Sequence, residues 1–217
     1  LNRLQEIVKP YLSREDYQKW RLIMKQCALE TERLTDKTQE RSILGEENIY
    51  YLRPYPYMIF RITKETSTLD QAIILGCFKL TRTFFEISVD TIISLFSDKD
   101  TLLKTFTKTP FYEESENTLL ARASKMPHTR IRQLNKANKR FLQDCHEHSV
   151  TVIHSPFSNI PKLEIAYLMT EVSISRKAHR YGNTSIQNDH PLKIPKPIYT
   201  VQVPIIEKSK EPTTIKS

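Results

Sequence analysis

The sequence predicts a mainly α-helical protein with a small β element, built as an irregular helical domain followed by an extended C-terminal arm. Apolar residues recur at three- and four-residue steps through most of residues 1–182, which is the spacing of amphipathic helices. Residues 183–217 are rich in proline and show no helical pattern. A small β element is predicted at residues 50–63, where aromatic and β-branched residues alternate, and an α+β arrangement is the alternative fold class.

The longest predicted helix spans residues 13–44. Ser13 followed by Asp16 is typical of a helix start, because the hydroxyl accepts a free backbone N–H and the acid lies at the positive end of the helix dipole. Gly45 is a typical stop. A helix of about thirty residues is about 45 Å long, more than a small domain needs for its own core, so we expect a spine or a docking surface. Its apolar stripe consists of Tyr17, Trp20, Ile23 or Met24, Cys27 and Leu34.

The other elements follow from apolar spacing and from flanking caps, glycines and prolines. Further helices are predicted over residues 1–12, 69–80, 82–96, 99–107, 115–126, 129–147 and 162–180. Residues 82–96 are rich in β-branched residues, so a strand is the alternative there. Residues 149–155 are predicted as a short strand, and residues 48–63 as two strands around a kink, because Pro54 and Pro56 each remove a ladder donor.

The composition excludes several classes of protein. The chain of 217 residues holds three glycines, whereas phosphate-binding loops need several close together. This excludes a Walker loop, a dinucleotide-binding turn and a kinase phosphate loop. No stretch approaches the roughly eighteen apolar residues that cross a bilayer, so no membrane span is expected.

Charge and cysteine content indicate the surroundings of the protein. The net charge of +8 and the pI near 9.3 predict attraction to polyanions, whether nucleic acid, an acidic protein surface or anionic lipid. Cys27, Cys77 and Cys145 are odd in number and widely spaced, which is typical of reduced thiols. We therefore expect an intracellular protein of the nucleus or cytoplasm, with an organelle matrix as the alternative.

The densest group of metal-ligating residue types runs from Cys145 through His146 and Glu147 to His148, with His154 following. Its spacing is poor for a metal, because structural zinc sites pair ligands in two separate knuckles and adjacent helical residues point in different directions. Histidines at a helix C-terminus are also favoured by the dipole alone. We expect no metal, no cofactor and no catalytic residues, although an enzyme without a recognisable motif remains a third class.

Basic residues in and before the predicted helix 129–147 form the strongest candidate binding site. Cations along one helix can follow a phosphate backbone. The candidate nucleic-acid-binding residues are Arg122, Lys125, Arg130, Arg132, Lys136, Lys139 and Arg140. An acidic protein partner and a plain solvated face are the alternatives.

The arm supplies the second candidate site. It carries short apolar beads that could dock in grooves of a partner, and a solvated tail is the alternative. The docking residues are Ile198, Tyr199, Val201, Val203, Ile205 and Ile206. The sequence thus favours a non-catalytic subunit or adaptor of a larger intracellular assembly, docking through its long helix and its arm. The alternative is a DNA- or RNA-binding protein that uses the basic helix.

Overall fold

The computed structural model describes residues 2–35, 39–40, 46–90, 109–126, 128–158 and 160–177, all of which belong to the first of the two units of the chain, Leu1–Gln187. No helix in these ranges is long and apolar enough to cross a membrane.

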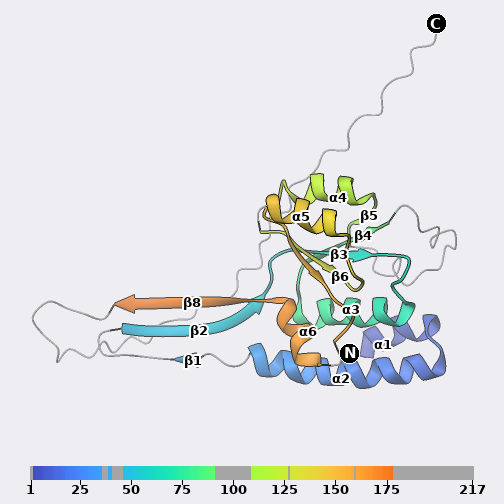
Figure 1. Ribbon diagram of the computed structural model, residues 1–217. Helices are drawn as coiled ribbons and strands as arrows, with labels where there is room; N and C mark the ends of the chain where they lie inside the picture. Colours follow the sequence, from blue (N-terminus) through green and yellow to red (C-terminus); the bar gives the residue numbers. More distant parts are fainter. Residues whose placement is uncertain are drawn as a thin grey trace, which may run out of the picture. The chain divides into compact units, whose positions relative to one another are not determined.

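The centre of the unit is a five-stranded parallel sheet with the strand order β5-β4-β3-β6-β7 (Figure 1). Its strands are β3 (Met58–Ile62), β4 (Phe85–Val89), β5 (Phe111–Glu113), β6 (Arg130–Gln133) and β7 (Thr151–His154). Helices connect them: α3 (Thr68–Thr81) follows β3, α4 (Glu116–Ala123) follows β5, and α5 (Lys139–Glu147) follows β6. The unit is therefore an α/β fold, and the prediction of a mainly α-helical protein is wrong.

Helices cover both faces of this sheet, so its central strands are buried on both sides. On one face lie α1 (Asn2–Val8), α2 (Arg14–Thr35), α3 and α6 (Pro161–Tyr167), and on the other lie α4 and α5 (Figure 1). A short 3₁₀ turn, Lys9–Tyr11, joins α1 to α2. Phe60 packs toward α2 and α3, while its neighbour Ile59 packs toward α4 and α5, as the two-residue period of a strand requires.

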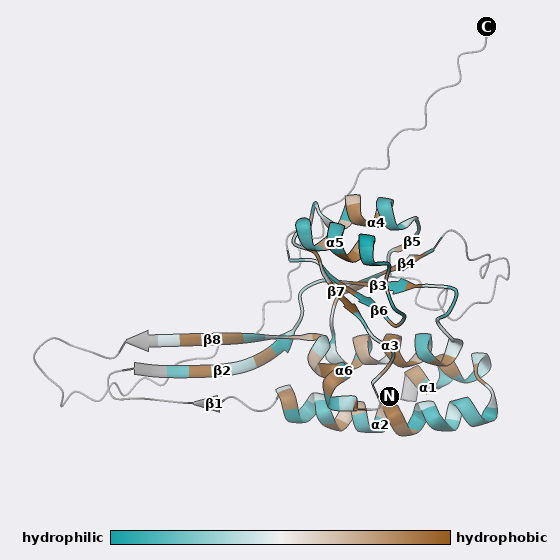
Figure 2. Ribbon diagram, viewed as in Figure 1, coloured by the Kyte–Doolittle hydropathy of each residue, from teal (hydrophilic) through white to brown (hydrophobic). Residues whose placement is uncertain are grey.

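The close approach of α2 and α3 anchors the first face. Trp20 Nε1 donates a hydrogen bond of 3.0 Å to the carbonyl of Ala72. Gly76 lies opposite Met24, and a Cβ atom at this glycine would come within 2.4 Å of Met24 Sδ. The apolar stripe predicted on the long helix is therefore used inside the unit, where Trp20, Met24 and Cys27 are all buried. In Figure 2, apolar colouring is concentrated on α3 and in patches on α2.

A second, antiparallel sheet has the order β1-β2-β8. β1 is only Gln39–Glu40, whereas β2 (Glu46–Pro54) and β8 (Met169–Lys177) pair along nine residues each. Pro54 ends β2, and β3 begins four residues later, so the two strands around a kink predicted for residues 48–63 are present.

Four predicted helices differ from the structure. The long helix ends at Thr35 rather than at residue 44, and β2 already begins at Glu46. Residues 82–96 contain β4, in line with their β-branched content, and residues 129–147 divide into β6 and α5. Residues 162–180 divide into α6 and β8, because polar residues alternate with Val172 and Ile174 at the period of a strand. The predicted helix 99–107 lies outside the described residues.

Candidate interaction site

Three of the seven candidate nucleic-acid-binding cations are engaged inside the protein. Arg132 on β6 is fully buried, and its Nη2 donates to both carboxylate oxygens of Glu164 on α6, at 2.9 and 3.0 Å. Its Nη1 donates to three backbone carbonyls, those of Gln133, Ile153 and Ser155. A guanidinium held in this way has no surface to offer a phosphate.

Arg122 on α4 pairs with Glu86 and Glu114, the Glu114 contact being 2.6 Å, and its guanidinium lies 4.1 Å from the ring centre of Tyr112. Burial lowers the pKa of Arg122, but the hydrogen bonds and charge of Glu114 and the charge of Glu86 outweigh this and raise it. Next to this pair, burial raises the pKa of the Tyr57 hydroxyl, with Glu86 adding to the effect. This buried ionic cluster links β4, α4 and the end of β5.

Arg130, at the start of β6, stacks on Tyr55 with 3.8 Å between the guanidinium carbon and the ring centre. It donates to the carbonyls of Tyr167 and Met169, and burial lowers its pKa. Tyr55 in turn donates to the carbonyl of His128. Tyr55 thus contributes to the packing between the two sheets.

The other four cations are exposed: Lys125, Lys136, Lys139 and Arg140. Lys125 follows α4, Lys136 follows β6, and the remaining two lie in the first turn of α5. Asn138 caps this helix by accepting the backbone N–H of Arg140.

The thiol and imidazole groups near residue 145 form no metal centre in the part of the chain that the structure describes. Burial raises the pKa of the Cys145 thiol to about 12, so it is a protonated core thiol rather than a nucleophile. His148 Nδ1 lies 2.8 Å from the carbonyl of Asp144 one turn earlier, which is a helix-end contact.

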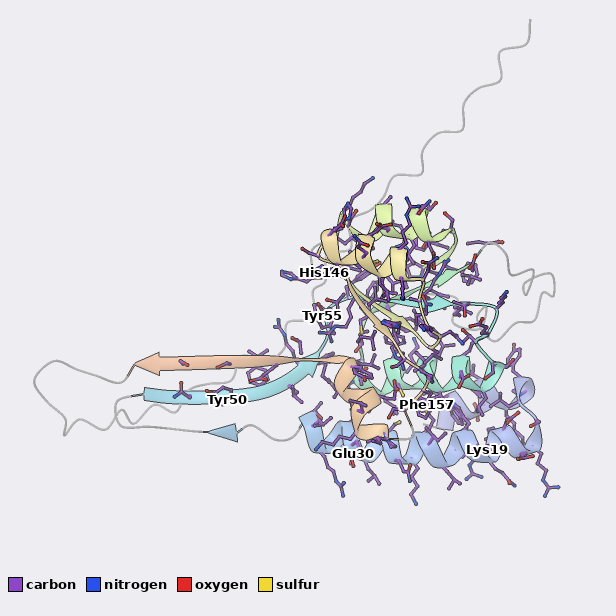
Figure 3. All side chains as sticks on the ribbon, in the orientation of Figure 1. Lys19, Glu30, Tyr50, Tyr55, His146 and Phe157 are labelled. Atoms are coloured by element: carbon purple, nitrogen blue, oxygen red, sulfur yellow. The ribbon has the colours of Figure 1, made fainter. Side chains whose placement is uncertain are left out.

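The pairing of β2 with β8 is one feature that the sequence did not reveal. In its register Ile49 lies opposite Ile174 and Tyr51 opposite Val172, and directly opposed residues share a face, so one face is apolar. The other face carries Tyr50 opposite Ser173, with Ser173 and Ser175 exposed. Figure 3 shows Tyr50 midway along β2, and Figure 2 shows apolar segments in both strands.

One long edge of this ribbon is open within the described residues. β8 pairs with β2 on one side, and no described strand pairs with it on the other. It is nine residues long and contains no proline. Edge strands of this kind present unpaired N–H and C=O groups that act as a template for another strand. The docking residues predicted in the arm, 198–206, lie outside the described residues.

Comparisons with known proteins assign no family. No protein-family model matches the sequence, and no curated protein sequence matches it. Among solved structures, similarity is found to Proline Utilization A from Corynebacterium freiburgense, with 14% identity, 73% of this chain and 14% of that chain covered, and a TM-score of 0.46. Histidinol dehydrogenase from Elizabethkingia anophelis gives 8% identity, 72% and 39% coverage and a TM-score of 0.46. Betaine aldehyde dehydrogenase from Staphylococcus aureus has 10% identity to this chain, with 66% of this chain and 31% of that chain covered and a TM-score of 0.44. The chain thus spans well under half the length of each of these proteins.

Proposed function

We propose that the chain is a non-catalytic subunit of a multi-chain assembly, and that it enters this assembly by pairing β8 with β8 of a second copy. The observation that supports this most is the open, proline-free edge of β8 within the described residues. Beyond the two residues of β1 that pair with β2, the ribbon is two-stranded, and a two-stranded ribbon is marginally stable in water by itself, so a further strand at this edge would stabilise it.

The sequence of β8 is compatible with antiparallel pairing to itself. Ser173 is the middle of the nine residues, so a two-fold axis placed there puts Ser173 opposite its own copy. The same register sets Val172 against Ile174 and Glu171 against Ser175. The apolar face of one ribbon then continues into that of the next, and no like charges face each other among these five positions.

Engineered cysteine and lysine residues test this arrangement. Ser173→Cys would place two thiols opposite each other across the axis, within reach of a disulfide, whereas Ser124→Cys on the exposed end of α4 would not. The native thiols do not interfere, because Cys27, Cys77 and Cys145 are buried. We expect a covalent dimer on a non-reducing gel for the first variant and a monomer for the second.

Sedimentation velocity supplies the second measurement. We expect the natural chain to form a dimer that Ser173→Lys weakens by up to about 1 kcal/mol, roughly fivefold in Kd, because two lysines would face each other. Ser124→Lys adds the same charge and should leave the dimer unchanged. A monomer at every concentration would refute the proposal. A dimer that Ser173→Cys does not cross-link and Ser173→Lys does not weaken would move the interface elsewhere.

A further inference from the structure

A crevice of about 590 Å³ opens beside the carboxyl ends of β3 and β6. The direction in which the chain adds strands to the sheet reverses between β3 and β6. From β3 the chain adds β4 and β5 on one side, and from β6 it adds β7 on the other side. α3 leaves β3 on the side of α2, and α5 leaves β6 on the opposite side (Figure 1). Helices that diverge in this way leave space between them, and ligands of open α/β sheets bind in this position. The volume is in the range of small-molecule sites.

Asn135, which follows β6, presents hydrogen-bond donors to this crevice. Its Oδ1 accepts from the hydroxyls of Thr63 and Thr66, at 3.0 and 3.1 Å. Thr66 Oγ1 also accepts the backbone N–H of Thr63 and lies 3.3 Å from Thr63 Oγ1. The amide oxygen faces these two hydroxyls, and the amide nitrogen is the group directed away from them. The amide nitrogen has no hydrogen-bond partner among the described residues, and Asn135 lines the crevice.

The remaining lining combines an apolar wall with charges of both signs. The ammonium groups are those of Lys19 on α2 and Lys136, and the carboxylates are those of Glu65 and Asp70 near the start of α3. The apolar wall consists of Ile23, Leu69, Ile73, Leu134, Pro156 and Phe157. Figure 3 labels Lys19 on α2 and Phe157 in the segment after β7.

The start of α3 is unsuited to a phosphate. Ser67 Oγ accepts the backbone N–H of Asp70, and the Asp70 carboxylate accepts the Ser67 hydroxyl proton. The helix end is thereby capped by side chains, and a carboxylate already lies at its positive end. Phosphate sites at helix ends need free N–H groups. The lining therefore favours a ligand that is neutral overall and carries both charges.

We propose that this crevice binds an α-amino acid with an apolar side chain. Its carboxylate accepts from the Asn135 amide and lies near Lys136, its ammonium lies near Asp70 and Glu65, and its side chain packs on the apolar wall. The proposal is independent of the pairing of β8, because none of the lining residues belongs to β2 or β8.

Isothermal titration calorimetry with L-leucine, 4-methylpentanoate, isopentylamine and glycine tests the proposal. L-Leucine has an ammonium, a carboxylate and an apolar side chain. 4-Methylpentanoate lacks the ammonium, isopentylamine lacks the carboxylate, and glycine lacks the apolar side chain. We expect saturable binding of L-leucine with one site per chain, and each analogue at least tenfold weaker, since a hydrogen bond to a charged group contributes about 1.5–3 kcal/mol and burial of an apolar side chain a similar amount. No heat from L-leucine at about 10 mM, the weak end of specific binding, would overturn the proposal. Binding of 4-methylpentanoate as tight as that of L-leucine would overturn the assigned ligand class.

Two variants connect such binding to the crevice. Asn135→Asp keeps an acceptor for both threonine hydroxyls and replaces the amide donors by a carboxylate oxygen, so L-leucine should bind at least tenfold more weakly. Gln143→Glu makes the same chemical change on the exposed face of α5 and should leave binding unchanged. Lys136→Gln, at an exposed position, should also weaken binding, while Lys139→Gln should not. Equal affinity in Asn135→Asp, Lys136→Gln and the natural chain would place the bound molecule elsewhere.

Discussion

The ion pair between Arg132 and Glu164 gives the sharpest test of the packing. Replacing Arg132 by Met keeps most of the side-chain volume but removes the cation from a carboxylate that is 1% exposed. It also removes the donor of three backbone carbonyls. Breaking one partner of a buried pair costs about 3–5 kcal/mol, because an uncompensated charge remains in the interior. For a chain of this size that corresponds to a fall in Tm of roughly 6–20 °C.

The measurement is urea unfolding followed by the fluorescence of Trp20, the single tryptophan and a buried one. Arg140→Met is the matched control, since Arg140 is exposed on α5 and its loss should change the free energy of unfolding by less than about 0.5 kcal/mol. In the double variant Arg132→Met with Glu164→Leu neither charge of this pair is left buried, so we expect it to be more stable than Arg132→Met alone. Equal losses for Arg132→Met and Arg140→Met would refute the buried ion pair.

Two further predictions concern the core. Gly76→Ala should lower the free energy of unfolding by about 1–3 kcal/mol, because the new Cβ would overlap Met24 Sδ. The same change in a Met24→Ala background should lower the free energy of unfolding by less. Equal losses in both backgrounds would contradict this contact. Cys145 has a pKa of about 12 against 9.0 for an ordinary thiol, so between these values the unfolded chain has lost a proton that the folded chain keeps. The contribution of Cys145 to stability is therefore complete below pH 9 and lost as the pH rises toward 12. The free energy of unfolding, measured with urea at several pH values, should fall more steeply with pH for the natural chain than for Cys145→Ala. Parallel curves would contradict the raised pKa.

Local signals in the sequence predicted several elements correctly. Ser67 and Asp70 form the cap that starts α3, Ser115 caps α4, and Pro54 and Pro56 lie where β2 ends and separate it from β3. These features depend on neighbours within a few residues, which a single sequence shows directly. The strand predicted at residues 149–155 contains β7 (Thr151–His154).

The parallel sheet was missed because its strands carry charges at buried positions. Glu86 on β4 and Arg132 on β6 interrupt the apolar runs that mark a buried strand, so the segment around Arg132 was predicted as a basic helix. Their partners lie 36 and 32 residues away along the chain, in Arg122 and Glu164. Burial of a charge depends on such pairing, and the distance between partners hides it from any local pattern. The crevice at β3 and β6 was missed for the same reason, since Lys19, Asn135 and Phe157 meet only in the folded chain.

The buried pairs also change how the positive charge of the protein should be interpreted. An ion pair inside the unit removes one cation and one anion from the surface together, so the net charge of +8 is unaffected. What changes is where the cations can meet a polyanion, because Arg122 and Arg132 are neutralised in place. Nucleic-acid binding by this region stays a prediction, and it now depends on the four exposed cations that follow α4 and β6 or begin α5. Since the salt dependence of binding scales with the number of phosphates contacted, four cations imply a shallower slope than the seven counted in the sequence.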